Sequence, residues 1–274
     1  MRLALSTNWC NSRIDSGEAI ADKAMELGFD ALELGFRTTA AQAKGIRSRL
    51  DRIPVGSVHA FCPVPISAPQ GYPELYPLAS FDAEAGRMAH LQVVRNIEFA
   101  AEMGATAVVL HAGRVPYRGL LRRWDIKRRT KRGQKLVDIF RRELDSLQSV
   151  LEKNKVVLGL ENLPYLEGFP AEWEMKELVG DWVKPWFDTG HDFVRRTEGW
   201  VTMPVADAAK GCVGMHVNDS VGGDDHLPPG EGKVDFAALR SAALVAEHLV
   251  FEPHSEVTEQ ALRKSLAFVR GIWD

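Results

Sequence analysis

The stretch VVLGLE at residues 156–161 is a short, Val-rich apolar run that ends on a carboxylate. Such a run is typical of a parallel strand buried on both faces. The same pattern, an apolar run closed by a His, Asp or Glu, recurs in SVH (57–59), AVVLH (107–111), VKPWFD (183–188), CVGMH (212–216) and HLVFE (248–252). Polar groups at the carboxyl ends of parallel strands face the crevice where α/β proteins bind ligands. These residues are therefore candidates for one shared site.

Around these runs, strand and helix signals alternate along the whole chain without a linker. We expect eight strands, at residues 2–6, 30–34, 55–59, 106–111, 155–161, 183–188, 212–217 and 248–252. Helical patterns lie between them, at 16–28, 82–103, 134–153, 171–179, 235–246 and 256–272. Strict alternation implies right-handed crossovers and a parallel sheet. The sequence therefore predicts an α/β fold, a single (β/α)8 TIM barrel over residues 1–274. A doubly wound open sheet is the alternative, although no GxGxxG follows the first strand.

Length and composition agree with one barrel and exclude several other classes. The chain has 274 residues, of which 45% are hydrophobic and 26% charged, as in ordinary globular proteins. A net charge of −3 and a pI of about 6.3 give no general attraction to nucleic acid. Three separated cysteines, Cys10, Cys62 and Cys212, form neither a disulfide framework nor a zinc motif, which favours a cytoplasmic location. No apolar run approaches the roughly 18 residues of a membrane span, so we expect no membrane partner.

The ends of the predicted strands and the loops that follow them carry candidate metal ligands. They are His59, His111, Glu161, Asp188, His191, His216, Asp224, His226 and Glu252. Any one of them alone could be a hydrogen-bonded core histidine or a helix cap. Together, however, the buried acids Glu161, Asp188 and Glu252 would repel one another unless a cation neutralised them. Mixed nitrogen and oxygen ligands suit Zn²⁺, Mn²⁺, Fe²⁺ or Co²⁺ better than Ca²⁺ or Mg²⁺.

Several motifs carry a resemblance to a known family. LEN (160–162), DTGH (188–191), MHVND (215–219), DDHLPPGEGKVDF (224–236) and FEP (251–253) resemble the xylose isomerase-like TIM-barrel superfamily. This superfamily contains sugar and sugar phosphate isomerases and epimerases, and also the endonuclease IV-related enzymes of AP endonuclease family 2. The resemblance implies one divalent ion, held by Glu161, Asp188, His216 and Glu252, with Glu161 and Glu252 as the catalytic acid and base.

The endonuclease IV branch extends the same core to three zinc ions. In that branch the resemblance assigns five more ligands, namely His59, His111, His191, Asp224 and His226. Two features separate this chain from that branch: Cys62 stands where an aromatic residue is expected, and LPYLEGFP (163–170) replaces a glycine-rich stretch. One feature separates it from the sugar branch, because an Arg that often follows the strand-seven ligand is absent from VNDSVGG (217–223).

We therefore expect a sugar isomerase or epimerase that uses one to three ions of zinc, manganese or cobalt. Proton transfer would pass through a metal-stabilised enediolate. A multi-zinc phosphodiesterase is the alternative, and a barrel that binds a metal or a sugar without turnover is a third. The substrate would be a small sugar or sugar phosphate, and nucleic acid is the less favoured partner. The sequence is also compatible with a homo-oligomer. The expected substrate-binding residues are Trp9, Glu33, Arg37 and His191.

Three segments have unusual composition or length. Residues 60–81 and 218–234 are longer than ordinary connections, and each follows a strand that ends on a candidate ligand. Residues 114–135 contain ten Lys or Arg and a single acid, Asp125. This basic segment is either a solvated helix start or an electropositive wall for a phosphate or carboxylate, with Tyr117 and Trp124 as stacking surfaces.

Overall fold

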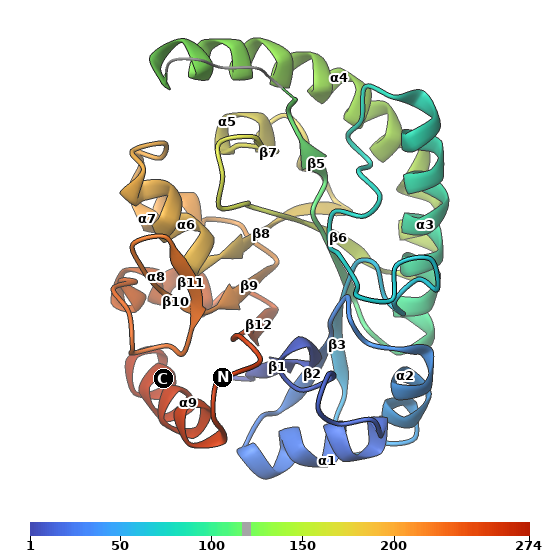
Figure 1. The fold of residues 1–274 in the computed structure, drawn as a ribbon, viewed down its shortest axis with the longest axis vertical. Helices are drawn as coiled ribbons and strands as arrows, with labels where there is room; N and C mark the ends of the chain where they lie inside the picture. Colours follow the sequence, from blue (N-terminus) through green and yellow to red (C-terminus); the bar gives the residue numbers. More distant parts are fainter. Residues whose placement is uncertain (117–121) are drawn as a thin grey trace.

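Eight parallel strands close into a barrel in the computed structural model, which describes residues 1–116 and 122–274 (Figure 1). Around the barrel the strands follow chain order, and the last pairs with the first. They are β1 (Ala4–Ser6), β2 (Ala31–Leu34), β3 (Val55–His59), β4 (Ala107–Leu110), β6 (Val157–Glu161), β8 (Val183–Asp188), β9 (Gly214–Val217) and β12 (His248–Phe251). The expected (β/α)8 barrel is confirmed, and closure rules out the open doubly wound sheet.

Helices surround the barrel on its outer face (Figure 1). They are α1 (Gly17–Leu27), α2 (Ala40–Arg47), α3 (Ala83–Glu102), α4 (Arg122–Asn154), α5 (Glu172–Met175), α6 (Thr189–Thr197), α7 (Val205–Ala208), α8 (Phe236–Ala243) and α9 (Glu259–Trp273). Side-chain caps start several of them, because Ser16, Thr39 and Asp82 each accept a hydrogen bond from a backbone N–H of the first turn. None of the helices in the described ranges is long and apolar enough to cross a bilayer.

Three helices and one helix start differ from the expectation. The short helices α2, α6 and α7, of eight, nine and four residues, were not predicted, because helices of this length carry little periodic pattern. In α6 the N-cap is itself a candidate ligand, Asp188. Helix α4 begins at Arg122 rather than at residue 134, so much of the basic segment forms its first turns. Tyr117 and the side chain of Trp124 lie outside the described residues.

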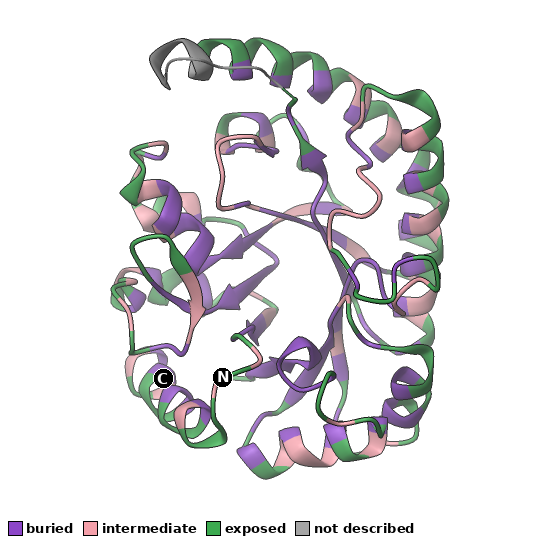
Figure 2. Cartoon of the chain, viewed as in Figure 1, coloured by how far each residue is buried: buried purple, intermediate pink, exposed green. Residues whose placement is uncertain are grey.

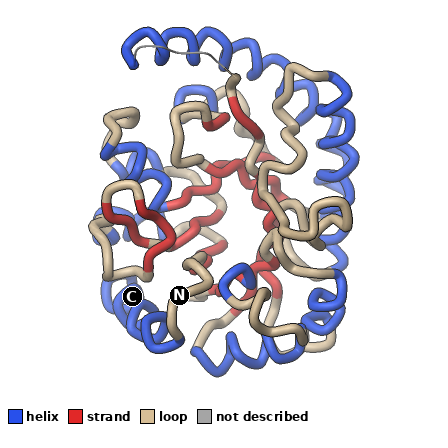
Figure 3. Tube along the Cα trace, in the orientation of Figure 1, coloured by secondary structure: helices blue, strands red, loops and turns tan. Residues whose placement is uncertain are grey.

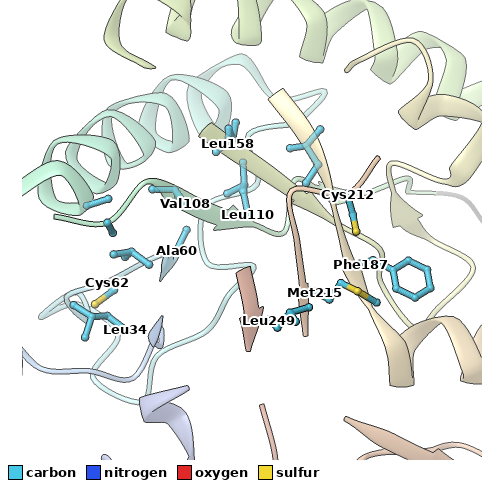
Figure 4. Packing of buried hydrophobic residues seen from close by; sticks show 14 of the residues in the cluster. Leu34, Ala60, Cys62, Val108, Leu110, Leu158, Phe187, Cys212, Met215 and Leu249 are labelled. Atoms are coloured by element: carbon cyan, nitrogen blue, oxygen red, sulfur yellow. The ribbon is translucent and has the colours of Figure 1, made fainter. Parts of the chain in front are cut away.

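The hydrophobic core has two layers, one on each side of the barrel wall. The larger layer fills the space between strands and helices, and Figure 4 shows part of it around Val108, Leu158 and Met215. Burial is concentrated on the strands and the inward faces of the helices (Figure 2). The smaller layer lies inside the barrel and is dominated by Trp186. Gly159 and Gly214 make room for this indole, because a Cβ at either position would lie within 2.8 Å of it.

Two small sheets and two long loops extend beyond the barrel at the carboxyl ends of its strands (Figure 3). One sheet pairs β5 (Gly113–Arg114) with β7 (Gly168–Phe169). The other is a hairpin of β10 (Asp219–Val221) and β11 (Asp224–Leu227), so the segment 218–234 is more regular than expected. Residues 60–81 contain no helix or strand, as predicted.

A single buried carboxylate orders the 218–234 segment. Asp219 accepts hydrogen bonds from the backbone N–H groups of Ser220, Gly230, Gly232 and Val234, each at 2.9 Å. At Gly232 a Cβ would lie 2.2 Å from Asp219 Oδ1, so glycine is required for this close approach. These bonds fix the loop that carries the candidate ligands after β9.

Candidate metal centre

The carboxyl ends of β3, β6, β9 and β12 bring four predicted ligands together. They form the inner group, which consists of His59, Glu161, His216 and Glu252. Glu161 Oε1 lies 3.0 Å from His216 Nδ1, and Glu252 Oε2 lies 3.1 Å from the same nitrogen. Glu161 Oε2 lies 3.2 Å from His59 Nε2. All four residues are buried, and barrel closure explains why side chains from distant parts of the sequence converge here.

Glu161 is the most crowded acid of the centre. Besides its two contacts within the inner group, Oε2 lies 3.0 Å from His111 Nε2, and Oε1 lies 3.4 Å from His191 Nδ1. Both carboxylate oxygens therefore face two imidazoles each. Glu252 is less enclosed by imidazoles: its other oxygen, Oε1, accepts a hydrogen bond of 3.1 Å from Asn8 Nδ2.

A second set of ligands lies beside the first and forms the outer group: Asp188, His191, His226 and Asp225. The first three place a ligand atom each within 4.8 Å of one another. Asp225 Oδ2 lies 3.8 Å from His191 Nε2. Asp188 also caps α6 by accepting a 2.7 Å hydrogen bond from the His191 backbone N–H, and its other oxygen accepts one of 2.8 Å from Asn218.

Asp224 does not lie where the Asp-x-His spacing placed it. Its side chain is 69% exposed and lies 3.8 Å from His254, whereas the adjacent Asp225 faces the outer group. The reason is a bulge: Asp219 pairs with Leu227 and Val221 with Asp224, so Asp225 and His226 stand opposite one residue. His226 also has a φ of 55°. Regular strand alternation would have put residues 224 and 226 on one face, and the bulge breaks it.

The donor set fits a divalent ion. With bonds of about 2.0–2.2 Å, neighbouring ligand atoms of a tetrahedral or octahedral ion lie roughly 3.0–3.6 Å apart. Contacts in the inner group span 3.0 to 3.2 Å. The candidate ligand atoms of both groups are imidazole nitrogens and carboxylate oxygens, which suit zinc, manganese and cobalt. Glu161 and Glu252 with His216, and Asp188 3.7 Å from His216 Nδ1, would hold such an ion.

The charges of the centre are strongly coupled. Burial by itself raises the pKa of Glu161, but the neighbouring charges of His216 and His111 outweigh it and hold the pKa well below its ordinary value. Burial likewise lowers the pKa of His111, yet the Glu161 carboxylate outweighs this and raises it to about 9. For His191 burial dominates, and its pKa falls to about 4. The negative charge of the buried acids therefore favours protonated, positively charged neighbours. A bound cation would supply the same compensating positive charge.

A cavity of about 350 Å³ opens onto the centre. Its floor includes His59, His111, Glu161, His191, His226 and Glu252, and its wall includes Arg37, as expected. Trp9 is 2% exposed and is not part of the cavity wall; its indole N–H donates instead to the Val257 carbonyl. Glu33 is fully buried beneath His216 and is not part of the wall either.

Several lining residues were missed by the sequence reasoning. Asn8, Phe36, Pro73 and His254 all line the cavity. Asn8 could have been found, because it lies two residues after the first strand, and polar residues at such positions face the site. A second cavity, of about 430 Å³, lies among α5, α6 and α7 and is lined by none of the candidate metal ligands.

Comparison with known proteins agrees with this architecture. Residues 21–272 match the family described as xylose isomerase-like TIM barrel. No curated protein matches the sequence. Among solved structures, a D-tagatose 3-epimerase-like protein is similar at 22% identity and a TM-score of 0.69, with 99% of each chain covered.

Two further structures share the fold at similar distance. The 3-keto-D-glucoside 4-epimerase of E. coli has 17% identity and a TM-score of 0.70, with 99% of each chain covered. A Thermus thermophilus protein soaked with zinc chloride has 22% identity and a TM-score of 0.63, covering 99% of this chain and 96% of its own. These likenesses show the fold, and the family match over most of the sequence shows that the chain belongs to the xylose isomerase-like TIM-barrel family.

Proposed function

We propose that the chain is a divalent-metal-dependent isomerase or epimerase of a sugar or sugar phosphate. The observation that carries this proposal is the placement of Glu161 and Glu252, 3.0 and 3.1 Å from the same nitrogen of His216, on the floor of a cavity. Paired carboxylates around one metal-binding position are what proton transfer next to a carbonyl requires. The ions would be zinc, manganese or cobalt, one to three per chain.

The chain's own residues supply the proton transfer. Glu252 lines the cavity, and Asn8 holds one of its oxygens, so the carboxylate is oriented to take a proton from the carbon next to the substrate carbonyl. Glu161 would return a proton from the other side. Arg37 and His191 line the cavity and would bind substrate oxygens. A divalent ion, when bound, would stabilise the negative charge that develops on the neighbouring substrate oxygens.

Glu252→Gln tests this assignment. The variant keeps the hydrogen bond to Asn8 but removes the base, so turnover should fall by roughly 10²–10⁴-fold while the fold is retained. We would measure deuterium uptake from D₂O into a panel of ketoses by NMR, with Glu231→Gln, a surface change, as the control. Unchanged deuterium uptake in Glu252→Gln would overturn the role of Glu252.

A phosphodiesterase is the second candidate, and a specific contact favours it. His59 and His111 both lie near Glu161 Oε2, at 3.2 and 3.0 Å, so this oxygen has two imidazoles of its own in addition to those that face Oε1. With the outer group, this arrangement could hold clustered ions of the kind that activate water against a phosphodiester. Elemental analysis separates the two: one ion per chain supports the isomerase, and two or three zinc ions direct the assays to phosphodiester and abasic-site substrates.

A further inference from the structure

The His216 ring presents its two nitrogens to opposite environments. Nδ1 faces the cluster of Glu161, Glu252 and Asp188. Nε2 points to a different carboxylate, Glu33, and lies 3.3 Å from its Oε2. A histidine that binds a metal through one nitrogen commonly donates the N–H of the other to a carboxylate or carbonyl, which fixes the tautomer and raises the basicity of the ligand.

Glu33 is a fully buried carboxylate with few partners. It lies in β2, it is 0% exposed, and Ser57 of β3 donates a 2.8 Å hydrogen bond to its Oε2. Its Oε1 lies 3.3 Å from His216 Nε2 but makes no hydrogen bond within the described structure. An ionised carboxylate is costly to bury unless it is paired. His216 provides the partner that stabilises the buried Glu33 carboxylate.

Aromatic contacts fix the plane of the His216 ring. His59 stacks on it with ring centroids 5.6 Å apart and planes 10° apart, and Trp186 meets it edge-on at 5.3 Å. Trp186 in turn fills the barrel interior against Gly159 and Gly214. The ring therefore has little freedom to turn, and the group at Nε2 decides which nitrogen keeps its lone pair.

We propose that Glu33 is a positioning residue of the metal centre: it accepts the Nε2–H of His216 and so directs the Nδ1 lone pair at the bound ion. This inference rests on the metal site of the proposed function, but not on its substrate. It also replaces the expected role of Glu33 as a substrate contact, since the residue contributes no surface to the cavity.

The test is the metal affinity of three variants, measured by competition with a chromophoric chelator for Co²⁺ and Zn²⁺. Glu33→Gln keeps the size of the side chain and removes its charge, and we expect affinity to fall about 10–100-fold. Glu33→Asp keeps the charge, but its shorter side chain moves the carboxylate away from His216 Nε2. This variant should therefore also weaken metal binding. Ser57→Ala, which leaves Glu33 in place, is the matched control and should change the affinity least.

The visible spectrum of bound Co²⁺ gives a readout that a merely structural role would not move. We expect Glu33→Gln to shift the cobalt bands while the metal-free melting temperature stays within a few degrees of the wild type. Wild-type affinity and an unshifted spectrum in Glu33→Gln would overturn the inference. If that variant does not fold, Glu33→Asp decides in the same way. A wild-type protein that binds the ion tightly but turns over no sugar would contradict the proposed function alone.

Discussion

The inner and outer groups of the metal centre lie side by side but are built differently. In the inner group every ligand sits at the end of a barrel strand or directly after it, and the barrel hydrogen bonds fix its backbone. In the outer group Asp188 also ends a barrel strand, β8, but His191 lies on the short helix α6, and Asp225 and His226 lie on a bulged hairpin. The inner group therefore depends on the closure of the barrel, whereas the outer group depends also on α6 and on the 218–234 segment that Asp219 holds in place.

This difference implies an order of metal affinity. The inner group is preorganised by elements that cannot move separately, and a preorganised ligand set loses little conformational freedom when an ion binds. Three residues of the outer group lie on a short helix and a hairpin outside the barrel wall, and elements of this kind open more readily than a closed barrel. We expect the inner site to fill first and the outer site to be the more easily emptied.

The largest effect is expected from Glu161→Gln, because Glu161 contacts ligands of both groups. Loss of its charge should remove every ion and lower turnover by at least about 10³-fold, since a bound ion contributes several kcal/mol of charge stabilisation. Ions per chain after dialysis, together with rates, check this. Retention of one ion at full occupancy would show that the inner group does not depend on Glu161.

His226→Ala should separate the two groups. The variant removes one imidazole of the outer group and leaves the inner contacts intact. We expect at least roughly 100-fold weaker binding of an outer ion and an unchanged inner ion. Metal titration followed by elemental analysis measures both. Loss of the inner ion as well would contradict the independence of the groups, and loss of all activity with the inner ion retained would favour the phosphodiesterase.

A matched pair of neighbouring acids tests the bulge. Asp225→Asn should weaken the outer site about tenfold, because Asp225 faces His191, whereas Asp224→Asn should leave it unchanged, because Asp224 faces solvent. The two variants have the same composition and charge. Equal effects of the two changes would mean that the bulge does not decide which carboxylate serves the site.

The smallest effect is the pH dependence of the metal-free protein. The raised pKa of His111, about 9, contributes stability that is present below about pH 6.5 and is lost as the pH rises through 9. The lowered pKa of His191, about 4, has the opposite effect on stability. The stability of the fold with neutral His191 is fully present above about pH 6.5 and is lost as the pH falls towards 4. Melting temperature measured with a chelator should therefore peak near neutrality and fall by roughly 5 °C on either side.

The same measurement with bound metal provides the control. Metal ligation requires deprotonated histidines, so the loaded protein should keep its melting temperature as the pH rises to 9. A metal-free protein that is more stable at pH 9 than at pH 6.5 would contradict the assigned protonation of His111.

The sequence could predict the barrel and most of the centre for the same physical reason. A strand buried on both faces is an apolar run, and a His, Asp or Glu at its end has few places to point except into the site. All eight barrel strands were predicted, six of them from apolar runs closed by a His, Asp or Glu. The four residues of the inner group were among the nine predicted ligands, although the set predicted to hold a single ion contained Asp188 in place of His59. The single carboxylate that fixes the 218–234 loop, Asp219, gives no such pattern, so the order of this loop was not predictable.

The direction in which a side chain points, within a loop or a buried layer, was harder to predict. Asp224 and Asp225 are adjacent in sequence, and only the extra residue in β11 shows which one faces the site. Glu33 follows the rule for a polar residue near a strand end, yet its side chain turns under His216 towards Ser57 rather than into the cavity. Trp9 likewise follows β1, but its indole satisfies a backbone carbonyl instead. These outcomes depend on hydrogen-bond partners that are distant in the sequence.

The depth of the centre has a consequence for the sequence of binding events. Three of the inner ligands, His59, Glu161 and Glu252, line the cavity together with Arg37, Pro73, His254 and Glu256, whereas His216 is fully buried behind them. An ion entering through the cavity must pass the space that a substrate would later fill. Metal and substrate would then bind in a compulsory order, with the ion first. Saturating substrate should consequently slow the escape of the ion to a chelator.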